Sequence, residues 1–307
     1  MLTTSIKCDV VDATLPRRQE LGEVKVFDPL GRTGMATASW SPVAASATWT
    51  QAREVAAHLM QVGWEQAKQD RDPQWRPAAA RHPAPLLLAA NAGRRTLADV
   101  GRWVDTVEQD EPELLLQKSP DPNANRAREV LASLWDKDQR YASSVLATLE
   151  EGLDPWQEPS IAQATAQPDV TADWLLGGAN TLYVLGGGQD QRRLASLYGA
   201  LLMRVIDDAL TIAGQQPSRR LERPLLCALD ELANVAPIPS LGRYASAGLG
   251  PGVLLLSVLQ DHSQALEHWG QERAQAFSPT RRASSSARAS AIPPRCATSP
   301  SSSGRSA

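Results

Sequence analysis

Two acidic residues, Asp230 and Glu231, directly follow the apolar run 225–229, which reads LLCAL. A short apolar run of this kind predicts a buried strand, and ligands of parallel sheets bind beyond the carboxyl ends of the strands. At that edge Asp230 would hold Mg²⁺, and Glu231 would orient and deprotonate the water that attacks a phosphate. A buried strand that runs into an acidic helix start would show the same pattern, because the helix dipole stabilises acidic side chains there.

A second apolar run, 253–259 (VLLLSVL), ends in Gln260. An apolar strand that ends in Asp-Glu is the Walker B arrangement of P-loop ATPases. In ATPases with an additional strand, a polar residue beside that strand senses the γ-phosphate. An amide suits the role because it can donate to a phosphate oxygen and accept from water. Gln260 would equally serve as the cap of a following helix, so this residue alone does not decide between the two roles.

The elements that must position these residues predict an α/β fold. Residues 181–185 (TLYVL) and 224–229 predict strands, and the apolar-periodic stretch 194–212 between them predicts a long helix. Near the start of the chain, the alternation in 23–27 predicts another strand, which the sequence DPLG at 28–31 ends with a turn. Apolar strands separated by helices indicate a parallel sheet that is covered on both faces.

A long zone from about residue 44 to residue 167 has a helical pattern instead. Apolar residues recur there at three- and four-residue spacing, with charged residues on the faces between them. The recurring positions are Val55, Leu59 and Val62, then Val100, Val104 and Val107, and then Val130, Leu131 and Leu134. The zone predicts an all-helical domain whose core contains tryptophan side chains.

Charge limits the kind of nucleic-acid contact. The 307 residues carry a net charge of −3, and the last 30 residues contain five Arg and no acidic residue. Residues 1–277 therefore carry −8. An acidic body disfavours a general nucleic-acid surface, which needs clustered Lys and Arg, so we expect DNA contacts to be local or to require an assembled ring.

The placement of Cys, His and apolar residues argues against metal sites, disulfide frameworks and membrane-spanning helices. The three Cys and four His are scattered without the spacing of metal ligands, which argues against a zinc site and against a disulfide framework. No run reaches the roughly 18 apolar residues of a membrane-spanning helix, so we expect a cytoplasmic protein.

The segment 278–307 is rich in Ser, Arg and Pro, with Ile292 as its one sizeable aliphatic residue. Such a segment cannot bury enough apolar surface to offset its chain entropy, and it predicts a disordered tail.

Several short segments together resemble one family, the TraG/TraD-type coupling proteins of type IV secretion systems. The longest is 229–239 (LDELANVAPIP), which is followed by 260–264 (QDHSQ) and 269–274 (WGQERA). Segments 4–9 (TSIKCD), 27–30 (FDPL) and 178–183 (GANTLY) also resemble the family and occur in the family's order. The resemblance thus extends over most of residues 1–277.

The family resemblance implies a RecA-like hexameric motor that uses ATP and Mg²⁺ to transfer DNA, with an all-helical domain inserted into it. It assigns Asp230 to the nucleotide and Mg²⁺, and Glu231 and Gln260 to catalysis. The implied partners are a relaxosome protein or secreted substrate protein, the type IV secretion channel, DNA in the assembled hexamer, and further copies of the chain. Full-length relatives are expected at the cytoplasmic face of the inner or plasma membrane.

On this basis we expect four segments. Residues 1–43 would be the N-terminal piece of the motor domain, 44–168 the inserted all-helical domain, 169–277 the C-terminal piece with the Asp-Glu pair, and 278–307 a disordered tail. The expected fold class is therefore α/β, with a partial RecA-like P-loop ATPase sheet.

The chain departs from the family in its phosphate-binding loop. No GxxxxGK[ST] occurs among the 307 residues, and the triple glycine at 186–188 is followed by Gln-Asp. In relatives the loop lies upstream of the segment that matches Thr4 and Ser5. Because that loop supplies the amides and the Lys that hold the phosphates, we expect a truncated motor that does not hydrolyse ATP alone. Two alternatives stay open, namely a non-catalytic module that recognises substrate or relaxosome proteins, and a decayed gene product.

Overall fold

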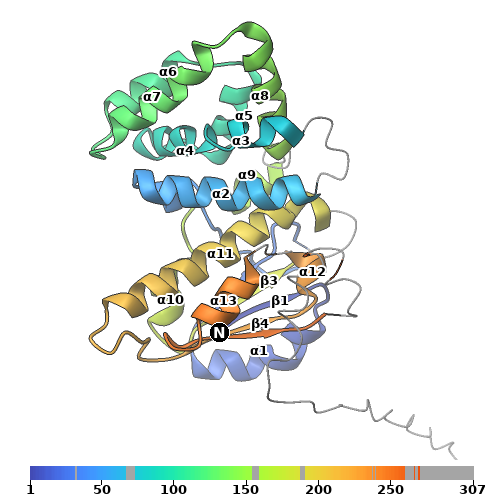
Figure 1. Cartoon of the computed structure of the whole chain (residues 1–307). Helices are drawn as coiled ribbons and strands as arrows, with labels where there is room; N and C mark the ends of the chain where they lie inside the picture. Colours follow the sequence, from blue (N-terminus) through green and yellow to red (C-terminus); the bar gives the residue numbers. More distant parts are fainter. Residues whose placement is uncertain are drawn as a thin grey trace, which may run out of the picture.

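The computed structural model of the chain describes residues 1–31, 33–66, 73–153, 159–186, 191–236, 238, 240–259, 266 and 269. A β-sheet forms the lower part of the molecule, with α1 (Asp9–Leu21) beneath it and the long helix α11 (Gln191–Gln215) above it (Figure 1). Further helices are stacked above α11. This arrangement confirms the predicted α/β fold class. Gln260 and the tail 278–307 lie outside the described residues.

Among the described residues, five strands form one sheet in which every pair is parallel, in the order β2-β3-β1-β4-β5. The strands are β1 (Leu2–Ser5), β2 (Val24–Phe27), β3 (Thr181–Leu185), β4 (Leu225–Leu229) and β5 (Val253–Ser257). The last four fall on the runs that predict strands in the sequence. The predicted turn after β2 is also present, because the amide of Gly31 donates to the carbonyl of Asp28 at 3.0 Å and Gly31 has a φ of 66°.

The upper face of the sheet is covered by α11. This helix falls on the predicted segment 194–212, and both its sheet side and its outer side are buried because α2 (Trp49–Gln66) packs along it. A helix enclosed in this way needs apolar residues around most of its circumference, as its sequence shows. Three short helices, α10 (Ala172–Leu176), α12 (Leu232–Val235) and α13 (Leu241–Ala247), complete this layer.

The helical zone predicted from the sequence does form helices. They are η1 (Ala44–Ser46), α2, η2 (Pro73–Trp75), α3 (Arg76–Ala79), α4 (Pro83–Ala92), α5 (Leu97–Asp105), α6 (Asp110–Gln117), α7 (Ala124–Trp135), α8 (Gln139–Leu153) and α9 (Pro159–Ala164). Trp103 is 1% exposed and Trp64 9% exposed, so tryptophan does fill part of the core. Val107 was predicted to be helical, but α5 ends at Asp105, and Val107 has a φ of 53° and is 44% exposed.

This helical zone is inserted between neighbouring strands. It begins after β2 and ends before β3, and these two strands pair directly, with Val24 opposite Thr181 and Phe27 opposite Val184. In Figure 1 the zone lies above α11, on the far side from the sheet. The chain therefore leaves the sheet and returns to it at adjacent positions.

The lower face of the sheet is only partly covered. Under β2 and β3, Val11 of α1 packs against Val26, Tyr183 and Leu185. Under β4 and β5 the apolar side chains are open, with Leu226 38%, Leu254 37%, Leu256 57% and Val258 47% exposed. The prediction of a sheet covered on both faces is therefore wrong for this part of the described chain. No described helix is long and apolar enough to cross a membrane.

Candidate active site

Asp230 and Glu231 lie at the carboxyl edge of the sheet, immediately after β4. β4 is flanked by β1 on one side and β5 on the other, so the acidic pair lies between the carboxyl ends of two further parallel strands. Both residues are half-buried. The edge position is the one predicted from the sequence, and it is where parallel sheets bind their ligands.

The main chain at Asp230 is held by the neighbouring strand. The hydroxyl of Thr4, which is fully buried in β1, donates to the Asp230 carbonyl oxygen at 2.7 Å. On the other side, the amide of Val258 donates to the carbonyl of Leu229 at 2.9 Å. The point where β4 ends is therefore fixed from both sides. The sequence alone gives Thr4 no role; the available signal was the polar run Thr3-Thr4-Ser5.

Glu231 has an unusual backbone conformation. Its φ of 46° and ψ of 40° lie in the left-handed region, which costs a non-glycine residue about 1–2 kcal/mol. Glu231 directly precedes α12, and its carbonyl accepts hydrogen bonds from the amides of Asn234 and Val235. The Asn234 side-chain amide also donates to the Glu231 carboxylate at 3.2 Å. Strained residues of this kind are concentrated at functional sites, where the surrounding structure holds them.

Gly186 forms the neighbouring part of the edge, directly after β3. A Cβ atom at this position would lie 2.9 Å from a ring carbon of Tyr198 and 3.1 Å from a methyl of Val235. Glycine is therefore needed for α11 and α12 to approach the end of β3. The two glycines that follow and Gln260 lie outside the described residues, so the role of Gln260 stays a prediction.

The acidic pair fits Mg²⁺ only as part of a larger ligand set. Among the described residues, no group of three or more His, Cys, Asp or Glu side chains could hold a metal ion. Mg²⁺ is commonly bound by one or two carboxylates, with waters and substrate phosphates supplying the other ligands. Two adjacent carboxylates at an edge are therefore suited to a magnesium–nucleotide complex and do not form an all-protein metal cage.

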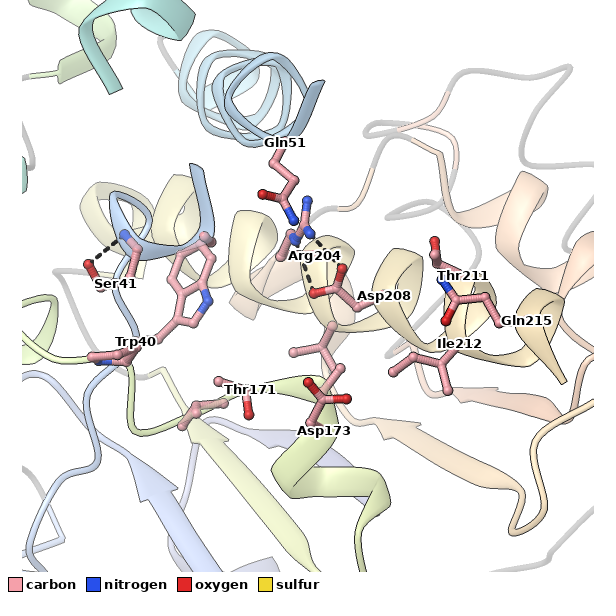
Figure 2. Close-up of a pocket in the computed structure, with 16 residues that line it drawn as sticks. Trp40, Ser41, Gln51, Thr171, Asp173, Arg204, Asp208, Thr211, Ile212 and Gln215 are labelled. Atoms are coloured by element: carbon pink, nitrogen blue, oxygen red, sulfur yellow. Dashed lines mark hydrogen bonds and ion pairs between the residues drawn. The ribbon is translucent and has the colours of Figure 1, made fainter. Parts of the chain in front are cut away.

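A separate hollow of about 430 Å³ lies between α11 and the segments that lead into and out of the helical zone (Figure 2). Its lining includes Trp40, Thr171, Asp173, Arg204 and Asp208. The Arg204 guanidinium is already engaged there, because it donates to both oxygens of Asp208 at 2.6 and 3.0 Å. This hollow could not be predicted from the sequence, because its lining comes from segments far apart in the chain.

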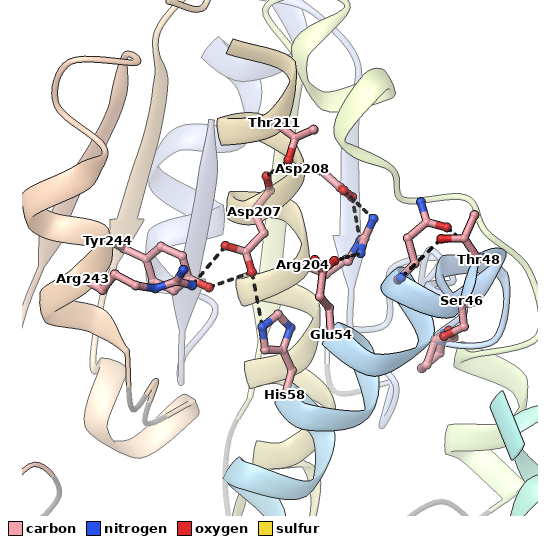
Figure 3. A network of polar contacts seen from close by, with 12 residues as sticks. Ser46, Thr48, Glu54, His58, Arg204, Asp207, Asp208, Thr211, Arg243 and Tyr244 are labelled. Atoms are coloured by element: carbon pink, nitrogen blue, oxygen red, sulfur yellow. Dashed lines mark hydrogen bonds and ion pairs between the residues drawn. The ribbon is translucent and has the colours of Figure 1, made fainter. Parts of the chain in front are cut away.

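A polar network connects the helical zone to α11 and α13 (Figure 3). Asp207 of α11 accepts a hydrogen bond from Tyr244 at 3.0 Å and one from Arg243 at 3.3 Å, and it lies 3.3 Å from the imidazole of His58 in α2. Burial alone would raise the pKa of Asp207, but the hydrogen bond and charge of His58, followed by Tyr244 and Arg243, hold this pKa below its ordinary value. The charged form of Asp207 thus links three helices.

Comparisons with known proteins agree with this architecture. The chain matches the family model described as type IV secretory system conjugative DNA transfer over residues 3–285. No curated protein sequence matches the chain.

Solved structures of a bacterial conjugative coupling protein, TrwB, have a similar fold. The unbound form of this protein without its first 70 residues is 17% identical, with a TM-score of 0.61, and the match covers 90% of this chain and 66% of that one. TrwB in complex with ADP and Mg²⁺ gives the same four values. The chain thus spans slightly less than two thirds of each of these two solved TrwB chains. Because the family match extends over nearly all of the sequence, this chain belongs to the type IV secretory system conjugative DNA transfer family.

Proposed function

We propose that this chain is the part of a conjugative coupling ATPase that carries the magnesium-facing carboxylates, and that it does not hydrolyse ATP by itself. The observation that carries the proposal is the placement of Asp230 and Glu231 at the carboxyl end of β4, with the main chain of Asp230 held by Thr4. TrwB, which has a similar fold, is known in complexes with ADP and Mg²⁺ and with non-hydrolysable ATP and GTP analogues.

In this proposal Asp230 binds Mg²⁺, directly or through water, and Glu231 orients and deprotonates the attacking water. Bound Mg²⁺ would bridge phosphate oxygens and neutralise the charge that develops during phosphoryl transfer. Gln260 would contact the γ-phosphate from the segment that follows β5. The hydrogen bond from Asn234 holds the Glu231 side chain toward the start of α12, and a water or nucleotide that approaches the edge would compete with it.

In this proposal the phosphate-binding loop lies outside the 307 residues, because GxxxxGK[ST] does not occur among them. Without its amides and Lys, the two carboxylates face a triphosphate without the groups that normally hold its phosphates. We therefore expect the purified chain to show no ATP hydrolysis above background. Addition of a chain with the loop should produce hydrolysis.

The test is to measure phosphate release by the chain alone, by the chain mixed with a loop-bearing partner, and by the mixture with Glu231→Gln. Glu231→Gln should abolish release in the mixture, and Glu20→Gln on α1, an exposed carboxylate paired with Arg17, should leave it unchanged. If the chain alone hydrolyses ATP and Glu231→Gln removes that activity, the proposed dependence on a second chain is wrong.

We further propose that residues 44–168 form the inserted domain and recognise a relaxosome protein or secreted substrate protein. The rest of the assembly would comprise further copies of the chain, DNA and the type IV secretion channel, at the cytoplasmic face of the membrane. The supporting observation is that the helices of this zone pack mainly on one another, while α2 provides the zone's main contact with α11.

A non-catalytic recognition module is the second candidate. It is favoured if a relaxosome protein binds the chain equally well with and without Asp230→Asn and Glu231→Gln, and if no partner restores hydrolysis.

A further inference from the structure

A hollow of about 340 Å³ lies within the helical zone, between α2, α7 and the turn that connects α3 to α4, in the upper part of the molecule (Figure 1). We call it the Arg hollow, because its charged lining residues are Arg53 of α2, Arg81 of the turn and Arg126 of α7. Its volume is at the small end of the range of ligand pockets, about 300–1,000 Å³.

The rest of the lining is largely apolar and comes from Trp49, Ala57, Ala80, Ala84 and Val130. Trp49 and Ala57 lie four residues before and after Arg53 on α2, and Val130 lies four residues after Arg126 on α7. Residues at this spacing share one face of a helix. Trp49 packs against the hydrophobic core and Val130 is 8% exposed, so the apolar part of the lining is held in place by packing.

The three guanidinium groups are only partly neutralised. Among the residues that the structure describes, the side chains of Arg53 and Arg81 form no ion pair or hydrogen bond. Arg126 pairs with Glu129 at 2.8 Å, but both side chains are about two-thirds exposed, and such a pair contributes little. Elsewhere in the zone several arginines are paired with carboxylates, namely Arg95, Arg102 and Arg128. The Arg hollow therefore holds positive charge that an anionic ligand would neutralise.

The polar side-chain groups of the lining are all hydrogen-bond donors. Among the described residues that line the hollow, these groups are the three guanidinium groups and the indole N–H of Trp49. Neither side chain can accept a hydrogen bond. A nucleobase would leave its own N–H groups without a side-chain acceptor, which is costly for a buried donor. A carboxylate offers acceptors only and fits this lining.

The charge around the hollow disfavours a long polyanion. Residues 44–168 contain 13 Lys and Arg but 18 Asp and Glu, so the zone carries a net charge of −5. Duplex or single-stranded nucleic acid needs basic side chains along its backbone, and here they are concentrated at one point of an acidic zone. A short segment with a few acidic residues can contact the arginines without facing the surrounding carboxylates.

We infer that the Arg hollow binds a short acidic segment of a protein partner. An apolar side chain of the segment would lie against Trp49 and Val130, while its carboxylates contact Arg53, Arg81 and Arg126. Planar guanidinium groups bind carboxylates through two parallel hydrogen bonds, and clusters of Arg recognise acidic motifs. That the segment belongs to a protein partner rests on the recognition role proposed for residues 44–168, whereas the preference for an acidic segment rests on the lining.

The probe is a fluorescein-labelled peptide of about ten residues in which Asp and Glu flank a Leu and a Phe, and its binding to the full chain is measured by fluorescence anisotropy. We expect the wild type to bind it, and the same peptide with Asn and Gln in place of the acidic residues to bind about tenfold more weakly or worse.

The double variant Arg53→Gln/Arg81→Gln should also weaken binding of the acidic peptide about tenfold or more, because two charge-assisted contacts are lost. Lys137→Gln/Arg140→Gln is the matched control, since it removes two exposed positive charges from the same zone but outside the hollow. It should bind as the wild type does. Circular dichroism shows whether both variants are folded.

The inference is wrong if the wild type does not bind the acidic peptide, or if the two double variants bind it equally well. If single-stranded oligothymidylate displaces the labelled peptide more effectively than the unlabelled peptide does, the hollow is a nucleic-acid site and the inference is overturned. It is also overturned if light scattering shows a self-associated chain that Arg53→Gln/Arg81→Gln dissociates, because a second copy then occupies the hollow. If the peptide binds at the hollow but no relaxosome or secreted substrate protein binds the chain, the Arg hollow stands and the recognition role proposed for residues 44–168 fails.

Discussion

The hydroxyl of Thr4 and the main-chain carbonyl of Asp230 are joined by a 2.7 Å hydrogen bond between residues 226 positions apart in the chain. Thr4 lies in β1, the central strand of the described sheet, so it ties the acidic end of β4 to the middle of the sheet. The bond acts on the backbone of Asp230, which leaves its carboxylate available for a ligand. Thr4 is therefore a positioning residue in the proposed site.

Thr4→Val should destabilise the fold by about 1–2 kcal/mol, because it removes the donor and leaves a carbonyl at the end of β4 without its partner. Urea unfolding followed by tryptophan fluorescence measures this change. Thr106→Val is the control, since that hydroxyl donates to the Arg102 carbonyl at an exposed helix end. Equal losses of stability in the two variants would contradict the special role of the Thr4 bond.

Stability should fall as the pH is lowered from about 6.5 toward 4 because of His82. Burial, with a smaller effect of Arg81, lowers the pKa of His82 to about 4, and the side chain is 4% exposed. In this window the unfolded chain binds a proton at His82 and the folded chain does not, so protonation favours unfolding. The slope has an upper limit of about 1.4 kcal/mol per pH unit from this one group.

The comparison is between the unfolding free energies of the wild type and His82→Gln at several pH values in that window. The absolute stability of the variant will differ, so the slope is the informative quantity. We expect a flatter dependence in His82→Gln. Parallel curves for the two proteins would show that His82 is protonated to the same extent in the folded and unfolded states.

Arg204→Met should destabilise the chain by about 3 kcal/mol. The Arg204 side chain is 8% exposed and lies between Glu54 of α2 and Asp208 of its own helix, at 3.0 and 2.6 Å. Its removal leaves partly buried carboxylates without their cation and weakens the joint between α2 and α11. Arg126→Met is the control, because the pair of Arg126 and Glu129 is about two-thirds exposed and such pairs contribute little. Thermal unfolding of both variants measures the difference, and a loss as small as that of Arg126→Met would refute the prediction.

The parts of the fold that the sequence predicts are those with a strong local pattern. β3 and β4 are short apolar runs, and α11 is a long periodic one, so local residue types were sufficient. Helix α1 was not predicted, because its 13 residues are mostly polar and include Pro16. Val107 continued a helical spacing, yet the chain had already left α5 in a left-handed conformation.

In the candidate site, too, some features follow from the local sequence and others depend on how distant segments pack. The position of Asp230 and Glu231 at the carboxyl edge follows from the apolar run before them, and the structure places them there. The hydrogen bond from Thr4 depends on strand order, which no local pattern encodes. The exposure of Leu254 and Leu256 could not be predicted either, because the sequence of an apolar strand is the same whether or not a helix covers it.

The strands β2 and β3 are adjacent in the sheet although 153 residues separate them in the chain, and this limits what the sheet requires of those residues. Because residues 28–180 depart and come back at neighbouring positions, the sheet needs only that the two attachment points stay close, whatever lies between them. Lengthening or replacing the intervening helices would leave strand pairing at the acidic edge untouched, provided that the surface facing α11 is kept. The geometry thus lets the helical zone change in length or sequence while the acidic edge of the sheet stays the same.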